Sequence, residues 1–205
     1  PSLSYSAYQH GQFWDMRKED LEGQSSDVIT NKEEMHGDMD AIVRKLNEDQ
    51  KYLAVFKQIY KTPNAEVWQL QNVLASYIRS LGKFNSNFDE YMRGNPSAMT
   101  ASQREGFNLF VGKGKCATCH FLPLFNGTVP PKYAKTEQEI LGTAMDGRNL
   151  TLDPDLGRGK FHETVEFLQY SFKTPTLRNI AKTAPYMHNG GYKTLKEVMH
   201  FYNKG

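Results

Sequence analysis

Cys116 and Cys119 are the two cysteines of the chain, and they are separated by two residues and followed directly by His120. The two thiols and the imidazole are all metal-binding or redox-active groups. Three kinds of chemistry use such residues at this spacing: a redox-active dithiol, half of a zinc site, or covalent attachment of a haem. A disulfide framework is not expected, because such scaffolds carry more cysteines in a shorter chain.

Haem attachment is the interpretation that uses all three residues. The two thiols add to the vinyl groups of the porphyrin, and the adjacent histidine binds the iron as its proximal ligand. A redox dithiol usually lies near a βαβ pattern, which this sequence lacks, and a zinc site would need a second pair of ligands. The motif therefore predicts a covalent haem c held by Cys116, Cys119 and His120.

A haem iron bound by His120 also needs a partner on its other face, and hydrophobic periodicity does not identify it. A methionine on a helix is more often packed in the core than bound to a metal. The residue types alone therefore leave the choice of distal ligand open. The candidates are Met145, Met187, His188, Met199, His200 and Tyr202.

Apolar residues recur at spacings of three and four in three successive segments, which predicts three amphipathic helices. These segments are residues 39–46, 53–60 and 67–81. Thr62 and Pro63 are expected to begin the third helix, since proline is favoured in a first helical turn, and Gly82 to end it. Residues 1–37 are mixed in composition and show no such periodicity.

A cluster of turn-forming residues, Gly94–Ser97, is interpreted as a domain boundary. A short helix is expected after it, with Thr100 or Ser102 as N-cap, with Ser102 and Glu105 at capping-box spacing, and with its end at Gly112. Phe107, Phe110 and Val111 are expected to form the buried side of this helix.

The stretch of residues 121–175 is rich in glycine, proline and aspartate and lacks periodicity, which is typical of a loop that wraps a cofactor. A last helix is predicted from Thr194, with Glu197 as its capping-box partner. Strand signals are scarce. The predicted fold class is therefore all-α, with long irregular loops.

The composition excludes several function classes. The 205 residues carry 25 Lys and Arg against 23 Asp and Glu, a net charge of +2, which is not the basic excess of a nucleic-acid-binding domain. No apolar run reaches the roughly 18 residues of a membrane span. Haem c is attached outside the cytoplasmic membrane in bacteria, so a periplasmic or other exported location is expected although no signal peptide is visible.

Several segments together resemble the bacterial di-haem cytochrome c peroxidase family, which includes MauG. They run through the whole chain in the order of that family: Pro1–Leu3, Phe13–Arg17, Leu21–Gln24, Asn31–Met35, Cys116–His120, Asp155–Arg158, Phe172–Asn179, Thr183–His188 and Thr194–Glu197. The resemblance implies two cytochrome-c-like helical domains, the first of them incomplete here. Residues 1–93 would be part of the peroxidatic domain and residues 94–205 the electron-transfer domain. The attachment motif of the peroxidatic haem would lie upstream of residue 1.

The resemblance also implies a catalytic set in the first domain. Trp14 falls where the family keeps a tryptophan between its two haems, a position suited to electron transfer. Gln24 and Glu34 match the residues of the peroxide pocket. Glu34 would move a proton between the peroxide oxygens as a general acid–base, and Gln24 would orient the peroxide.

Two further sites follow from the resemblance alone. Thr183 and Pro185 match residues that offer backbone carbonyls to a calcium ion, which prefers oxygen ligands. The distal ligand of the second haem falls on Tyr202, as in MauG-like members, where ordinary peroxidases have methionine. A phenolate ligand favours higher oxidation states of iron than a methionine does.

The expected function is reduction of hydrogen peroxide to water, with electrons from a small cytochrome c or cupredoxin relayed through the haem on Cys116, Cys119 and His120. Two alternatives are a MauG-like oxidase acting on a protein substrate and a mono-haem electron carrier. Tyr202 favours the first alternative, whereas Gly114 stands where MauG would carry a surface tryptophan. The resemblance also allows a homodimer.

Overall fold

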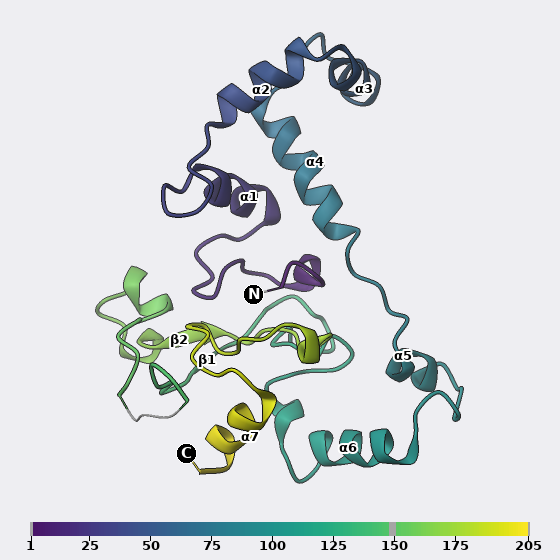
Figure 1. Ribbon diagram of the computed structural model, residues 1–205, viewed down its shortest axis with the longest axis vertical. Coiled ribbons are helices and arrows are strands. Elements are labelled where there is room, and N and C mark those ends of the chain that lie inside the picture. Colours follow the sequence, from purple (N-terminus) through teal and green to yellow (C-terminus); the bar gives the residue numbers. More distant parts are fainter. Residues whose placement is uncertain (1, 148–150, 205) are drawn as a thin grey trace.

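The computed structural model describes residues 2–147 and 151–204 (Figure 1), so Pro1 of the resemblance lies outside the described residues. The described chain is mostly helical, which confirms the predicted fold class. Its α-helices are α1 (Leu21–Thr30), α2 (Met39–Glu48), α3 (Gln50–Tyr60), α4 (Val67–Arg79), α5 (Asn87–Met92), α6 (Ala101–Val111) and α7 (Leu195–Lys204). Its strands are β1 (Gln138–Ile140) and β2 (Ser171–Lys173).

Helices α1 to α4 form a bundle in the upper half of Figure 1, and apolar side chains of α1, α2 and α4 meet in its interior. One buried cluster joins Ile29, Met39, Val43 and Leu70, and another joins Leu21, Ala75 and Ile78. The three helices expected over residues 39–81 are therefore present. They pack through the stripes that predicted them.

The beginnings of two helices differ from the sequence prediction. Helix α4 begins at Val67 rather than at Thr62 and Pro63, because Glu66 and Gln69 form a capping box, with the Glu66 amide donating to Gln69 Oε1 at 3.1 Å. Helix α1 was not expected from periodicity. Its signal is Asp20, whose side chain accepts a hydrogen bond from the Gly23 amide at 2.7 Å.

Helix α6 ends at Gly112 as predicted and begins after Thr100, one of the two expected N-caps, but its capping-box partner and its packing differ from the expectation. Thr100 forms the capping box with Gln103, so the expected Ser102 and Glu105 box is wrong. No residue of α6 is fully buried. Phe107 and Phe110 are half-buried and pack against Phe88 and Phe125, whereas Val111 is 42% exposed, so the expected buried side is found only in part. Helix α7 has the predicted cap: the Glu197 amide donates to Thr194 Oγ1 at 3.2 Å, and Glu197 Oε2 accepts from the Thr194 amide.

The chain between α6 and α7 is mostly irregular, as expected. Its strands β1 and β2 pair antiparallel with Gln138 opposite Lys173 and Ile140 opposite Ser171. Short 3-10 turns complete this stretch, at Cys116–Thr118, Arg158–Phe161, Glu166–Leu168 and Ile180–Lys182; a further one lies at Ser6–Tyr8.

The N-terminal segment, residues 5–18, contacts the second half of the chain. Thr128 Oγ1 donates to the Tyr8 carbonyl at 2.8 Å, and the His10 amide donates to Thr136 Oγ1 at 2.7 Å. In Figure 1 this segment lies between α1 and the strands. Contacts thus cross between residues 1–93 and 94–205, and the division at residue 93 stays a prediction.

Among the described residues, no helix is both long enough and apolar enough to cross a bilayer.

Candidate functional site

Cys116 and Cys119 lie on one tight turn directly after α6. Residues Cys116–Thr118 form a 3-10 turn, and the His120 amide donates to the Cys116 carbonyl at 3.0 Å. Both cysteines are half-buried and neither is in a disulfide. The turn therefore fixes two reduced thiols and the histidine as one unit.

The imidazole of His120 is held in one tautomer. Its Nδ1 lies 3.0 Å from the Pro175 carbonyl and 3.2 Å from the Phe125 carbonyl. Carbonyl oxygens only accept, so Nδ1 carries the proton and Nε2 keeps its lone pair. Burial lowers the pKa of His120, which favours the neutral ring that binds metal ions.

These features fit an iron ligand. A metal-binding histidine almost always donates its other ring N–H to a carbonyl or carboxylate, which orients the ring and raises its basicity. His120 has this arrangement with two carbonyls, and the thiols of Cys116 and Cys119 stand beside it. The residues present are thus those that a covalently attached haem requires.

Tyr202 lies on α7 in the neighbourhood of the same thiols. Partial burial raises the pKa of its phenol, and charge on Cys119 and Cys116 raises that pKa further. Its side chain remains 54% exposed. Among the distal candidates, Tyr202 is therefore the one whose pKa is raised by charge on the two cysteines.

The other distal candidates have different surroundings. Met145 and Met199 are 52% and 58% exposed. His188 stacks on Phe172 with ring centres 3.8 Å apart, and its Nε2 lies 3.5 Å from Asp153 Oδ1. None of these observations tests the choice of distal ligand, which stays a prediction.

The expected catalytic residues lie on the first half of the chain. Trp14 precedes α1, and its carbonyl accepts from the Lys173 amide of β2 at 2.8 Å, so it lies where the N-terminal segment meets the second half. Gln24 is on α1, and its Oε1 is buried without a hydrogen-bond partner. Glu34 is exposed after α1 and accepts from Asn31 Nδ2 at 2.9 Å. Within the described residues no hydrogen bond joins Trp14, Gln24 and Glu34 to one another, and their roles stay predictions.

The calcium prediction concerns an exposed turn. Thr183 and Pro185 are exposed, and Thr183 Oγ1 donates to the Ile180 carbonyl at 3.2 Å. Within residues 2–147 and 151–204, no three His, Cys, Asp or Glu side chains gather to hold a metal ion. The predicted calcium ligands are backbone carbonyls rather than such side chains, so the calcium site stays a prediction.

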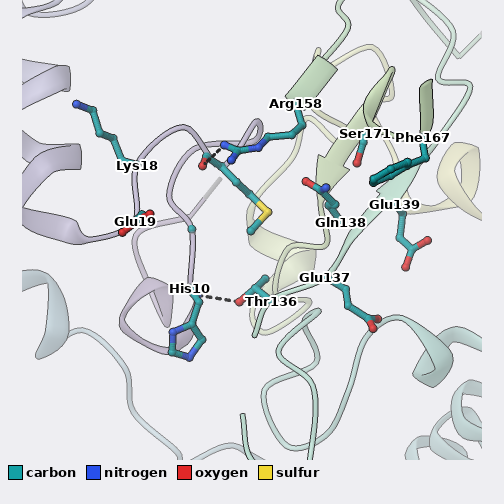
Figure 2. Close-up of a pocket in the computed structure, with 12 residues that line it drawn as sticks. His10, Lys18, Glu19, Thr136, Glu137, Gln138, Glu139, Arg158, Phe167 and Ser171 are labelled. Atoms are coloured by element: carbon teal, nitrogen blue, oxygen red, sulfur yellow. Dashed lines mark hydrogen bonds between the residues drawn. The ribbon is translucent and has the colours of Figure 1, made fainter. Parts of the chain in front are cut away.

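A cleft of about 610 Å³ lies between the N-terminal segment and β1. Figure 2 shows Lys18, Arg158, Glu137 and Glu139 among the charged residues that line it. Glu139 also raises the pKa of the Cys119 thiol, although burial is the larger cause. The cleft thus adjoins the cysteine pair through Glu139.

Two buried charged residues, Lys173 and Arg178, were not found from the sequence. Lys173 is 2% exposed, and its Nζ donates to Gln9 Oε1 and to the Gly11 carbonyl, each at 2.9 Å. Arg178 is 8% exposed and pairs with Asp89. Their partners are far away in the sequence, so no local pattern marks them.

The model of the di-haem cytochrome c peroxidase family matches residues 1–97. Over 94% of the chain, the sequence is 33% identical to the methylamine utilization protein MauG of Methylorubrum extorquens, of which it covers 51%. It is 28% identical to the cytochrome-c peroxidase IdrP2 of Denitromonas iodatirespirans, covering all of this chain and 60% of that protein. The chain thus spans about half to three fifths of these relatives.

The fold is also found in solved structures. A MauG-like protein associated with microbial copper homeostasis superposes on 98% of the chain with a TM-score of 0.82 and 25% identity, over 60% of its own length. The di-haem peroxidase BthA of Burkholderia thailandensis superposes on 94% of the chain, and on 51% of its own, with a TM-score of 0.69 and 22% identity. The resemblance recognised from the sequence motifs is thereby confirmed.

Proposed function

Because this chain is a relative of the di-haem cytochrome c peroxidase and MauG proteins, we propose that it is the electron-transfer part, with a portion of the peroxidatic part, of a di-haem peroxidase. The observation that carries the proposal is His120, whose Nδ1 donates to two carbonyls while Nε2 stays available to a metal. The family match to residues 1–97 adds support.

The residues of this chain have distinct tasks in the proposed enzyme. Cys116 and Cys119 would hold the porphyrin through thioether bonds, and His120 would bind the iron through Nε2. When bound, haem c supplies one-electron redox chemistry. The carbonyls of Phe125 and Pro175 hold the Nδ1 proton of His120 and so keep the ring in position.

Glu34 and Gln24 act on hydrogen peroxide in this proposal. In the overall reaction hydrogen peroxide takes up two electrons from the donor protein and two protons and gives two water molecules, and the Glu34 carboxylate would carry a proton from one peroxide oxygen to the other. Gln24 orients the peroxide with its amide, and its buried Oε1 has no partner within the protein. Trp14 stands between the two parts of the enzyme and carries electrons between them.

A MauG-like oxidase acting on a protein substrate is the second candidate. Tyr202 favours this function, because a tyrosine ligand stabilises higher oxidation states of iron. Burial raises the pKa of Tyr202, and charge on the thiols of Cys119 and Cys116 raises it further. Gly114, at the position of a MauG surface tryptophan, argues against radical transfer along that route. A mono-haem carrier is disfavoured by residues 1–97, which such a protein would not need.

The proposal includes partners and a location. A small cytochrome c or cupredoxin donates electrons, calcium binds at the Thr183 and Pro185 carbonyls, and the enzyme is periplasmic. The homodimer remains part of the same proposal. Each of these rests on the family resemblance and on the export that haem c attachment requires.

Glu34→Gln in the full-length, haem-loaded protein tests the peroxidase function. We expect kcat/KM for hydrogen peroxide to fall by about 10²-fold or more, because the carboxamide cannot accept the peroxide proton. The neighbouring Glu33→Gln is the matched control and should keep activity, since Glu33 is also exposed on this turn. Unchanged turnover in Glu34→Gln would remove Glu34 from the mechanism.

Tyr202→Phe tests the distal ligand. Loss of the phenol oxygen should change the optical spectrum and the midpoint potential of the haem on His120. Tyr77→Phe, at an exposed tyrosine of α4, should leave both unchanged. An unaltered spectrum in Tyr202→Phe would show that Tyr202 is not the ligand.

A further inference from the structure

The two carbonyls that hold His120 belong to two separate segments of the chain. Phe125 lies in the loop that follows the cysteine turn, and Pro175 lies after β2. The hydrogen bonds that join the segments include those from the Leu177 amide to the Phe125 carbonyl at 2.9 Å, from Thr176 Oγ1 to the Leu124 carbonyl at 2.7 Å and from the Gly127 amide to the Thr174 carbonyl at 3.2 Å. The position of the acceptors therefore depends on what holds these two segments together.

Arg178 joins the same two segments through its side chain. Its backbone continues the segment that contains Pro175, and its amide donates to Thr176 Oγ1 at 3.2 Å. Its guanidinium donates to the Pro123 carbonyl in the other segment, from Nε at 3.0 Å and from Nη2 at 2.7 Å. Arg178 thus spans the pair of segments on which the acceptors of His120 lie.

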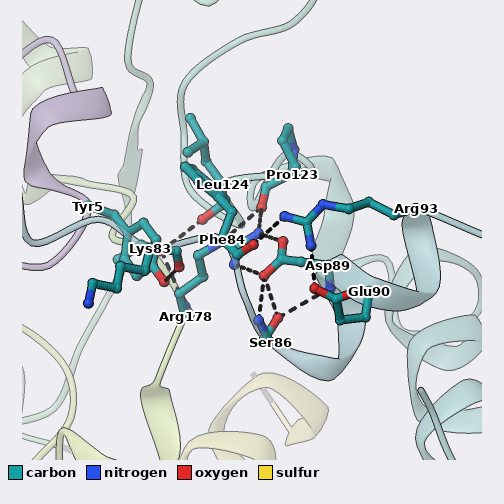
Figure 3. A network of polar contacts seen from close by, with 11 residues as sticks. Tyr5, Lys83, Phe84, Ser86, Asp89, Glu90, Arg93, Pro123, Leu124 and Arg178 are labelled. Carbon is teal, nitrogen blue, oxygen red and sulfur yellow. Dashed lines mark hydrogen bonds and ion pairs between the residues drawn. The ribbon is translucent and has the colours of Figure 1, made fainter. Parts of the chain in front are cut away.

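Asp89 on α5 fixes the guanidinium from the opposite side (Figure 3). Its two oxygens accept from Arg178 Nη1 at 2.9 Å and Nη2 at 2.7 Å, and Ser86 donates to the same carboxylate. Asp89 and Arg178 are 7% and 8% exposed. Buried pairs of this kind are geometrically strict, and the Arg178 hydrogen bonds hold the pKa of Asp89 well below its usual range.

Aromatic rings enclose the guanidinium. Its central carbon lies 4.7 Å from the ring centre of Phe84, 5.2 Å from that of Tyr5 and 5.6 Å from that of Phe125. Phe125 is the residue whose carbonyl accepts from His120. Arg178 therefore contacts this residue through its ring and holds the loop around it through Pro123.

We propose that Arg178, fixed by Asp89, is a positioning residue for His120 and sets the strength of the hydrogen bonds from His120 Nδ1 to the Phe125 and Pro175 carbonyls. Asp89 lies on α5, in the first half of the chain, so the pair connects this half to the segments that hold His120. The inference rests on the haem attachment in the proposed function, but not on peroxidase activity.

The strength of these hydrogen bonds has an electronic consequence. A strong bond from Nδ1 gives the imidazole more anionic character and a more basic Nε2, which favours the more positively charged, oxidised iron. A looser bond favours the reduced iron. Loss of the Arg178 contacts should weaken the hydrogen bonds from His120 Nδ1. The midpoint potential of the haem on His120 should therefore rise.

Arg178→Met in the full-length, haem-loaded protein tests this inference by spectroelectrochemistry. We expect an upward shift equivalent to about a tenfold change in the oxidised-to-reduced ratio, or about 59 mV for one electron. Arg178→Lys keeps the charge but loses the planar fork, and Asp89→Asn keeps the volume but loses the charge. Both should shift the potential upward by less than Arg178→Met does.

Arg79→Met is the matched control. Arg79 of α4 forms a two-bond pair with Glu22 of α1, at 2.8 and 2.9 Å, and neither residue belongs to the segments that contain Phe125 and Pro175. Loss of Arg79 should leave the potential unchanged. An equal shift in Arg79→Met would overturn the inference, because it would mark a general effect of destabilisation.

The outcomes distinguish the inference from the proposed function. A wild-type protein without covalent haem, as measured by pyridine haemochrome, would overturn the proposed function. Haem-loaded Arg178→Met and Asp89→Asn with the wild-type potential would overturn the inference alone. Where Arg178→Met fails to bind haem, Arg178→Lys and Asp89→Asn decide by the same criterion.

Discussion

The helical bundle α1 to α4 and the irregular region between α6 and α7 are held together by different forces. The bundle has two buried clusters of apolar side chains, such as that of Ile29, Val43 and Leu70. In the irregular region many of the buried side chains are polar or charged: Asn126, Thr128, Thr143, Ser171, Lys173, Thr174 and Arg178. Apolar contacts are non-directional, whereas a buried charge needs specific partners, and Lys173 and Arg178 have theirs. Asn126 Nδ2, Thr143 Oγ1 and Thr174 Oγ1 are buried without a hydrogen-bond partner among the described residues. The second region therefore depends on a few specific pairings.

Helices α6 and α7, which flank the irregular region, also differ from the bundle in burial. Neither α6 nor α7 has a buried residue, although both carry apolar side chains. A porphyrin supplies apolar surface of its own, so we expect the attached haem to contribute contacts that the bundle obtains from its side chains. The two regions should therefore respond differently to loss of the haem and to loss of a leucine.

Removal of the haem should have the largest effect. In a Cys116→Ser, Cys119→Ser variant we expect covalent haem to fall to near zero and amide hydrogen exchange to rise over residues 113–194, because the porphyrin contacts are lost. Residues 21–79 should keep their protection. Mass spectrometry gives the haem content and the exchange pattern, and equal loss of protection in both regions would contradict the comparison.

Truncation of a leucine should destabilise the protein more in the bundle than in α6. Leu70→Ala removes a side chain that is 8% exposed within the bundle cluster and should lower the free energy of unfolding by about 2–5 kcal/mol. Leu109→Ala is the matched control on α6, where the side chain is 53% exposed, and should cost less than about 0.5 kcal/mol. Urea denaturation measures both, and similar losses would show that α6 is packed as tightly as the bundle.

The buried Lys173 should give the irregular region a pH dependence. Burial lowers its pKa from 10.5 to about 8. The unfolded chain therefore binds more protons between these two values, so the free energy of unfolding should rise with pH from about 8 to 10.5, by up to roughly 3 kcal/mol. Below about pH 8 this contribution should be constant.

Lys173→Met isolates that contribution. The difference in unfolding free energy between the wild type and this variant should grow with pH over the stated window, in the direction of a more stable wild type. If the free energies of unfolding of the two proteins changed with pH in parallel, the pKa of Lys173 would not be lowered by burial.

Local patterns predicted the bundle and the cysteine motif because their signals lie within a few residues. The apolar stripes gave α2, α3 and α4, and the pair Thr194 and Glu197 gave the beginning of α7. The same kind of pattern left two caps for α6 open, Thr100 and Ser102, because both lie near a suitable partner, and only the path of the chain selects Thr100.

The sequence by itself determined which groups can bind a haem, since Cys116, Cys119 and His120 are adjacent and their spacing is local. It also carried the resemblance to the di-haem cytochrome c peroxidase family and predicted the helical class. Only the tertiary structure decided how His120 is held, because Pro175 lies 55 positions away, and what fixes Arg178, whose partner Asp89 lies 89 positions away. Pairings over such distances arise when the chain packs and leave no periodic signal in the sequence.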